Sequence, residues 1–155
     1  RYYSFSRGCQ KNRILSYLLD TCFLSEFVKQ EPSKLVLGWM EQQNEQNLYI
    51  SSITWGELQR GVAKLPFSHR KSDLTVWLNQ MKESFSSRIL PISVDVSEQW
   101  GLMTADLESR GLAMPLMDSL IAATARHYQM TLVTRNVNDF KDTQLQLINP
   151  WQEYK

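Results

Sequence analysis

The feature that most constrains the fold of this chain is its alternation of short apolar runs with longer amphipathic segments. The apolar runs are rich in β-favouring residues and predict five strands, at residues 15–19, 48–53, 89–93, 131–134 and 145–148. Helical periodicity and breaker residues predict helices at residues 26–29, 34–46, 54–64, 68–86 and 96–110 and from Pro115 onward. Because strands that alternate with helices usually pair in parallel, the pattern predicts a single α/β domain with a parallel sheet.

The first thirteen residues stand apart from this pattern, since they carry four basic residues and no acid. We expect residues 1–13 to be a disordered upstream extension or an expression remnant, and residues 14–155 to form the domain. A basic stretch before an apolar run also occurs in signal peptides, but here Asp20 interrupts the run and no small-residue cleavage site follows. No stretch is long enough to span a membrane, so no membrane partner is expected.

Composition narrows the chemistry that the chain can perform. Its formal net charge of +1 neither requires nor excludes a nucleic-acid partner. Cys9 and Cys22 form no CxxC pair, which argues against a disulfide scaffold and predicts a cytoplasmic protein. His69 and His127 are isolated in the sequence, so local spacing provides no zinc site.

Four acidic residues fall where predicted strands end or predicted helices begin. Asp20 ends the first strand, Glu57 lies just beyond the second, and Asp139 lies in the turn after the fourth. The carboxyl ends of parallel strands share one edge of the sheet, where ligands usually bind. We therefore expect these three side chains at one edge, joined there by Asp118 from the helix that Pro115 opens.

Each acid also has a purely structural interpretation as a helix cap. Asp20 can cap a helix that begins directly after it, and Glu57 can be the capping-box partner of Thr54. Asp118 and Asp139 can each stabilise the positive end of a helix dipole. Capping accounts for any one of these residues alone, but not for four carboxylates directed at one edge.

A cluster of carboxylates needs a cation, because neighbouring carboxylates repel one another and raise one another's pKa. Oxygen ligands of this kind suit Mg²⁺ or Mn²⁺. These ions activate water and stabilise the oxygens of an in-line phosphodiester displacement. The acids therefore predict the chemistry of a metal-dependent nuclease.

Four segments around these acids form a set of motifs, namely residues 17–26 (YLLDTCFLSE), 53–61 (ITWGELQRG), 115–123 (PLMDSLIAA) and 134–140 (TRNVNDF). In this order they resemble the motifs of PIN-domain ribonucleases of the VapC/FitB group, which are the toxins of type II toxin–antitoxin systems. The resemblance extends from Ser16 to Trp151. It implies a three-layer α/β/α sandwich around a central parallel sheet, hydrolysis of RNA with Mg²⁺ or Mn²⁺, a cognate antitoxin and a homodimer.

The resemblance also assigns roles to single residues. Asp20, Glu57 and Asp118 match the catalytic metal ligands of the family. The fourth acid of the family lies either at the position of Asn136 or at that of Asp139. Because Asn136 is neutral, the acidic role falls to Asp139, and Asn136 is left as a further ligand or a positioning group.

Two hydroxyl residues and one thiol are expected beside these ligands. By resemblance, Thr21 and Thr134 orient the carboxylates or a bound water, although capping or strand packing explains them equally well. Cys22 stands where relatives often carry Asn, and a thiol cannot copy the hydrogen bonds of an amide.

An RNA substrate requires positive charge near the acidic edge. Arg135 lies within the fourth motif and Arg60 within the second, and we expect one of them to contact phosphate. A solvated helix surface or a surface ion pair is the more ordinary interpretation of Lys64, Arg70 and Lys71, which belong with His69 to the densest basic stretch of the chain. Core packing, a dimer face and an antitoxin groove all remain open for four tryptophans, Trp39, Trp55, Trp77 and Trp100.

The alternative to an enzyme is a catalytically silent PIN domain that acts as a protein- or RNA-binding module, because a fold does not by itself imply an activity. Retention of all four acids favours the enzyme. Metal binding discriminates between the two hypotheses.

Overall fold

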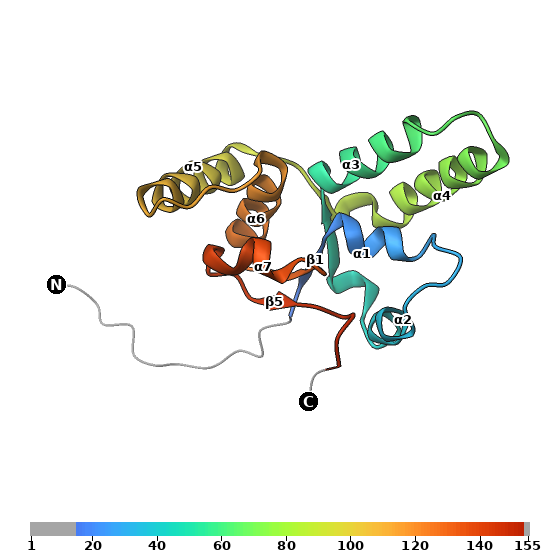
Figure 1. Ribbon diagram of the computed structural model, residues 1–155, viewed down its shortest axis with the longest axis horizontal. Coiled ribbons are helices and arrows are strands. Elements are labelled where there is room, and N and C mark those ends of the chain that lie inside the picture. Colours follow the sequence, from blue (N-terminus) through green and yellow to red (C-terminus); the bar gives the residue numbers. More distant parts are fainter. Residues whose placement is uncertain (1–14, 154–155) are drawn as a thin grey trace.

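The computed structural model describes residues 15–153, and a five-stranded sheet lies at its centre (Figure 1). The strands are β1 (Tyr17–Leu19), β2 (Leu48–Ser51), β3 (Ile89–Leu90), β4 (Thr131–Val133) and β5 (Leu147–Ile148). Their order across the sheet is β3-β2-β1-β4-β5, and every neighbouring pair is parallel. The predicted parallel sheet is therefore confirmed, while the prediction for residues 1–13 concerns a segment outside the described residues.

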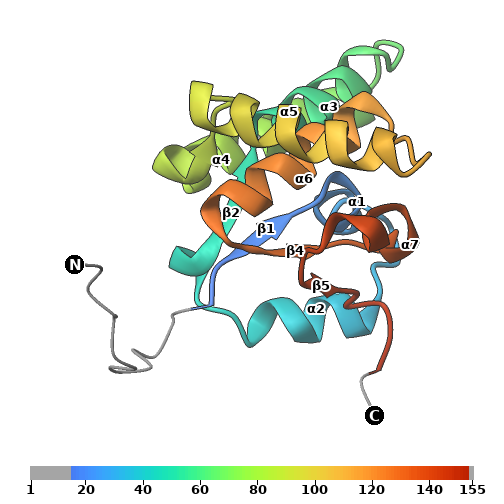
Figure 2. The same ribbon diagram turned by 90° about the vertical axis from the view of Figure 1, so that its left-hand side faces the viewer.

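Seven α-helices are formed by the described residues. They are α1 (Thr21–Glu26), α2 (Lys34–Glu41), α3 (Ser52–Ala63), α4 (His69–Phe85), α5 (Val94–Ser109), α6 (Leu116–Tyr128) and α7 (Val137–Phe140). Short 3-10 turns follow at Glu45–Asn47, Ser86–Arg88 and Lys141–Thr143. In Figure 1, α5, α6 and α7 lie to one side of the sheet and α1 to α4 to the other, and Figure 2 shows β1 between α6 and α2.

The two-residue period of the central strands divides the core into two layers. Leu18 and Leu132 are fully buried in the layer that contains α5 and α6. Their successors, Leu19 and Val133, are fully buried in the other layer, among side chains of α1 to α4. Burial of one such side chain contributes about 1.5–3 kcal/mol, so the alternation sets which face of the sheet each helix covers. The α/β/α sandwich is thereby confirmed.

Some predicted helix bounds are confirmed and others are wrong. The helices predicted at 68–86 and 96–110 are α4 and α5, with ends shifted by one or two residues. The helix predicted at 26–29 instead begins at Thr21, because the Asp20 side chain accepts a hydrogen bond from the Thr21 backbone N–H and caps the helix there.

Two further differences concern the end of α2 and the exposure of Leu116 in α6. The helix predicted at 34–46 ends at Glu41, and a 3-10 turn follows before β2. In α6, Ile121 and Ala125 are buried as their spacing indicates, but Leu116 is 57% exposed.

The four tryptophans at helical positions, Trp39, Trp55, Trp77 and Trp100, are all half-buried against one of the two core layers.

Gly111 ends the turn that follows α5, and its positive φ of 72° explains why a glycine stands there. Its N–H donates to the Glu108 carbonyl at 3.0 Å, and the N–H of Leu112 donates to the Leu107 carbonyl at 2.9 Å. The turn directs the chain from α5 into the segment that opens α6, and it thereby helps to place Asp118.

We predict that Gly111→Ala lowers the free energy of unfolding by about 1–2 kcal/mol, because an L-residue is strained at this backbone conformation. Gly101→Ala is the matched control, since Gly101 lies within α5 and an added methyl group meets open space. That variant should gain about 0.5–1 kcal/mol. Urea denaturation measures both changes. A Gly111→Ala protein as stable as the wild type would contradict this account of the turn.

Candidate active site

Asp20 lies where β1 ends, and both of its carboxylate oxygens accept hydrogen bonds. The Thr21 backbone N–H donates to Oδ1 at 2.8 Å, and the Thr134 hydroxyl donates to Oδ2 at 2.7 Å. Asp20 and Thr134 are both buried, and they follow the adjacent strands β1 and β4. The side chain is therefore held in one orientation at the carboxyl edge of the sheet.

Glu57 is connected to the same edge through α1. The Thr21 hydroxyl donates to Glu57 Oε1 at 2.7 Å. The predicted capping box between Thr54 and Glu57 is wrong, because α3 begins two residues earlier and is capped by the Ser51 hydroxyl, which accepts from the Ile53 N–H. Glu57 therefore lies in the second turn of α3 and does not cap that helix.

Thr54 itself is fully buried in α3, and within residues 15–153 its hydroxyl has no hydrogen-bond partner. A buried hydroxyl without a partner is a cost to folding. Thr54 is thus buried within the protein, and Glu57, three residues later, makes the contact with Thr21.

Asp118 lies in the first turn of α6 and has a perturbed pKa. Burial raises the pKa of this carboxyl group, and the negative charges of Asp20, Asp139 and Glu57 raise it further. Asp118 therefore interacts electrostatically with three acids that come from other segments of the chain. The edge carries an excess of negative charge that a cation would offset.

Asp139 lies in α7 and is exposed to solvent. Together with Asp118 it lines a cavity of about 290 Å³ between the loop before α6 and the segment around α7. Asn136 donates its backbone N–H to the Thr134 hydroxyl at 3.1 Å. The same cavity contains Asp142, an acid that sequence reasoning missed because it lies in a 3-10 turn outside the four motifs.

The donor set suits a hard divalent cation. It consists of carboxylate oxygens, whereas zinc sites in proteins usually include His or Cys ligands. Among residues 15–153, no three His, Cys, Asp or Glu side chains are arranged to bind one ion together. Mg²⁺ is often held by only one or two carboxylates and completed by water and substrate phosphate, so the residues fit this ion with a partly hydrated shell.

Cys22 lies directly beside the Asp20 carboxylate. Its thiol donates to Asp20 Oδ2 at 3.5 Å, and its sulfur accepts from the Arg135 N–H at 3.5 Å. Burial and the negative charge of Asp20 raise the pKa of the Cys22 thiol to about 11. Cys22 is therefore a neutral, weak hydrogen-bond donor at neutral pH. Sequence reasoning identified its position but not this contact.

The basic residues divide into two groups. Arg60 and Arg135 are both exposed, on α3 and in the loop after β4. Arg70 and Lys71 have structural contacts instead, since Arg70 donates to the Val28 carbonyl at 2.7 Å and Lys71 to the carbonyls of Ala63 and Leu65. These two side chains stabilise loops.

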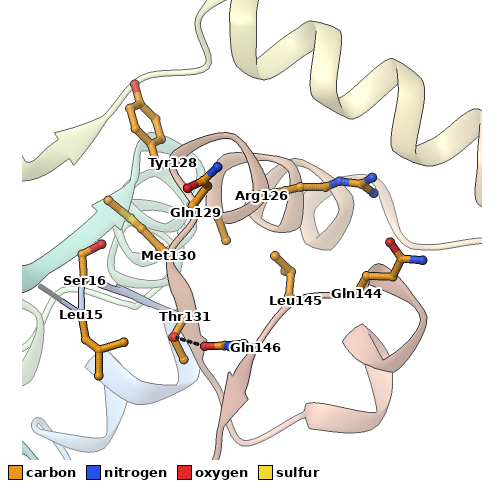
Figure 3. A pocket seen from close by; sticks show the side chains of 11 residues that line it. Leu15, Ser16, Arg126, Tyr128, Gln129, Met130, Thr131, Gln144, Leu145 and Gln146 are labelled. Atoms are coloured by element: carbon orange, nitrogen blue, oxygen red, sulfur yellow. Dashed lines mark hydrogen bonds between the residues drawn. The ribbon is translucent and has the colours of Figure 1, made fainter. Parts of the chain in front are cut away.

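A second cavity, of about 470 Å³, lies at the opposite edge of the sheet (Figure 3). Its lining includes Ser16 before β1 and Thr131 at the start of β4, and Arg126 is its charged lining residue. Because the amino ends of these strands form this cavity, it is separate from the carboxylates.

Within residues 15–153, no helix combines the length and apolar character needed to cross a membrane.

Comparison with known proteins gives consistent matches. Residues 17–144 match the family model described as PIN domain. VapC ribonuclease Y4jK of Sinorhizobium fredii is 33% identical over 87% of this chain and 97% of its own length. Toxin FitB of Neisseria gonorrhoeae is 31% identical over 88% of this chain and 99% of its own length.

Solved structures agree with these relatives. A structure of FitAB bound to IR36 DNA fragment matches with a TM-score of 0.85 and 30% identity, over 90% of this chain and 98% of that chain. A structure of FitAcB from Neisseria gonorrhoeae matches with a TM-score of 0.84 and 31% identity, over 88% of this chain and 99% of that chain. The chain belongs to the PIN-domain family. Within the family it falls in the group that contains the VapC ribonucleases and toxin FitB.

The raised pKa of Asp118 has a consequence for stability. The folded protein holds the Asp118 proton at a higher pH than the unfolded chain does, so the ionised group destabilises the fold above the folded-state pKa. We predict that Asp118→Asn raises Tm near neutral pH in EDTA, and that the gain disappears at about pH 3, below the ordinary pKa of aspartate. A gain of roughly 2–4 °C would correspond to about 1 kcal/mol, and partial exposure of the group keeps it at or below that size.

The matched control is Asp95→Asn, because Asp95 also lies in the first turn of a helix, α5, but is not among the charges that act on Asp118. Loss of its interaction with the helix dipole should leave Tm unchanged or slightly lower. Thermal melts followed by circular dichroism measure both variants. An Asp118→Asn protein without a gain near neutral pH would refute the repulsion among the four acids.

Proposed function

We propose that this protein is a Mg²⁺- or Mn²⁺-dependent endoribonuclease and the toxin component of a toxin–antitoxin pair. The observation that carries the proposal is the hydrogen-bonded arrangement at the carboxyl edge of the sheet, where Thr134 donates to Asp20 and Thr21 donates to Glu57. Burial, together with the charges of Asp20, Asp139 and Glu57, also raises the pKa of Asp118. A carboxyl group with a perturbed pKa beside other acids, at the carboxyl edge of a parallel sheet, is typical of functional sites. Relatives that the chain matches over most of its length are named VapC ribonuclease and Ribonuclease VapC2.

In this proposal Asp20, Glu57, Asp118 and Asp139 are the catalytic residues and supply the oxygen ligands of the ion. The ion, when bound, would lower the pKa of an attacking water and neutralise charge on the phosphate. Waters and substrate phosphate would supply the other ligands of the ion, as is usual for Mg²⁺.

The hydroxyls of the site have positioning roles. Thr134 orients the Asp20 carboxylate through Oδ2, and Thr21 orients the Glu57 carboxylate through Oε1. The ion or its waters would bind the remaining lone pairs of these carboxylates. Asn136 lies one turn before Asp139 and is exposed, which suits a second positioning group or a ligand. Arg135 and Arg60 are exposed and would contact the phosphates of RNA.

The proposed partners are an antitoxin protein and a second copy of the chain. Structures that this chain resembles contain FitAB and VapBC complexes. In this chain, apolar side chains are exposed on α5 and at the start of α6, where Val94 is 82%, Leu102 62% and Leu116 57% accessible. Exposed apolar surface of this kind suits protein contacts.

The second candidate is a catalytically silent PIN domain that binds protein or RNA. One observation favours it, namely that no three metal-binding side chains among the described residues are arranged around one point. An enzyme of the proposed kind would hold its ion through some of the four carboxylates directly and through the others by way of bound water, so activity separates the two candidates.

We predict that the wild-type protein cleaves a mixed pool of RNA with Mg²⁺ or Mn²⁺, that EDTA abolishes cleavage, and that Asp118→Asn lowers the rate by about 100-fold or more, as is usual for loss of a group acting on the reacting atoms. Asp95→Asn is the control and should cleave as the wild type does. Gel analysis of end-labelled RNA measures the rates. Equal cleavage by wild type and Asp118→Asn, or cleavage that survives EDTA, would refute the mechanism, and no cleavage by any protein would favour the silent module.

A further inference from the structure

Arg135 and Trp151 form a contact that the motifs do not explain. The Arg135 guanidinium carbon lies 5.6 Å from the centre of the Trp151 ring, within the range of a cation–π interaction. Arg135 directly follows Thr134, whose hydroxyl holds the Asp20 carboxylate. The stacked pair therefore borders the candidate active site.

The backbone around Arg135 is fixed on both sides. Its N–H donates to the Cys22 sulfur at 3.5 Å, and its carbonyl accepts from Asn149 Nδ2 at 3.4 Å. Asn149 also accepts from the Trp151 backbone N–H at 3.0 Å. Asn149, which is buried, thus links the loop after β4 to the segment after β5 and brings the ring beneath the guanidinium.

Trp151 is in turn anchored against α1. Its ring meets the ring of fully buried Phe23 edge to face, with centroids 6.2 Å apart. Its indole nitrogen is buried beside the carboxylate of Glu26, without the geometry of a hydrogen bond. Lys29 chiefly holds the pKa of Glu26 below its usual value, against the effect of burial, and the Ser33 N–H and the Trp151 indole add to the lowering.

Among residues 15–153, the head group of Arg135 has no acidic partner. The described residues form two ion pairs, Lys29–Glu26 and Arg110–Asp106, and neither includes Arg135. An arginine stacked on an aromatic ring keeps its N–H groups at the edge of the plane, where they match a phosphate. A side chain already held in place also loses less conformational entropy on binding.

We propose that Trp151 is a positioning residue that holds the Arg135 guanidinium at the rim of the carboxylate site for contact with an RNA phosphate. The inference rests on the proposed function, since it requires RNA as the substrate. It adds a residue outside the four motifs to the substrate-binding surface and assigns it a role through Arg135.

The test measures the affinity of the full chain for a fluorescein-labelled single-stranded RNA of mixed sequence by fluorescence anisotropy. All proteins carry Asp118→Asn, so that the probe stays intact. We expect Arg135→Ala to raise Kd about ten-fold, as for a lost charge-assisted contact. Trp151→Leu should raise Kd about two- to five-fold, as for a lost cation–π contact. The double variant should bind no more weakly than Arg135→Ala alone, because both changes remove one interaction.

Two variants separate positioning from packing. Trp39→Leu removes a comparable edge-to-face contact with Phe23, whose ring centroid lies 5.4 Å from that of Trp39. Among the described residues, no cation is found over the Trp39 ring. The Kd of Trp39→Leu should therefore equal that of the parent. Trp151→Phe keeps an aromatic face and should bind within about two-fold of the parent. Circular dichroism melts verify that each variant is folded.

The outcomes distinguish the inference from the proposed function. A parent protein that binds no RNA overturns the proposed function and the inference with it. A parent that binds RNA while Trp151→Leu binds equally well overturns the inference alone. The inference is also overturned if the double variant loses as much binding free energy as the two single variants together. It is overturned likewise if Trp39→Leu weakens RNA binding as much as Trp151→Leu does, because Trp151 would then act only through packing.

Discussion

The hydrogen bonds of the Asp20 carboxylate are the constraint on which the rest of the site depends. They connect the end of β1 to the hydroxyl of Thr134 after β4 and to the first turn of α1. From that turn the Thr21 hydroxyl extends the connection to Glu57 in α3. A buried carboxylate is tolerated only when such donors compensate for lost hydration. The hydrogen bonds that compensate for the burial of Asp20 therefore also hold the carboxylates of Asp20 and Glu57 at the same edge of the sheet.

Asp118 shows the cost of this arrangement. Burial and three neighbouring acids disfavour its charged form, so the folded chain holds an electrostatic strain that a bound cation would relieve. Strain of this kind is common at functional sites, where stability is given up for chemistry.

The sequence predicted those features that follow from periodicity. Alternating apolar residues at Leu18 and Leu19 determine which side of the sheet each helix covers, and strand ends determine where Asp20 lies. The start of α3 was predicted wrongly, because Ser51 and Thr54 are both good caps and only the burial of Thr54 decides between them. The Arg135–Trp151 contact depends on how two loops meet in space, for which local sequence carries no signal.

The central claim, that the acids at the carboxyl edge of the sheet bind a divalent cation, is tested most directly by Mn²⁺ binding followed by electron paramagnetic resonance. We expect the wild-type protein and Asp95→Asn to remove free Mn²⁺ from solution with equal affinity, and Asp118→Asn to bind Mn²⁺ at least about ten-fold more weakly, because it lacks a charged ligand. The same Mn²⁺ affinity for Asp118→Asn as for the wild type, or no binding by the wild type, would contradict this claim.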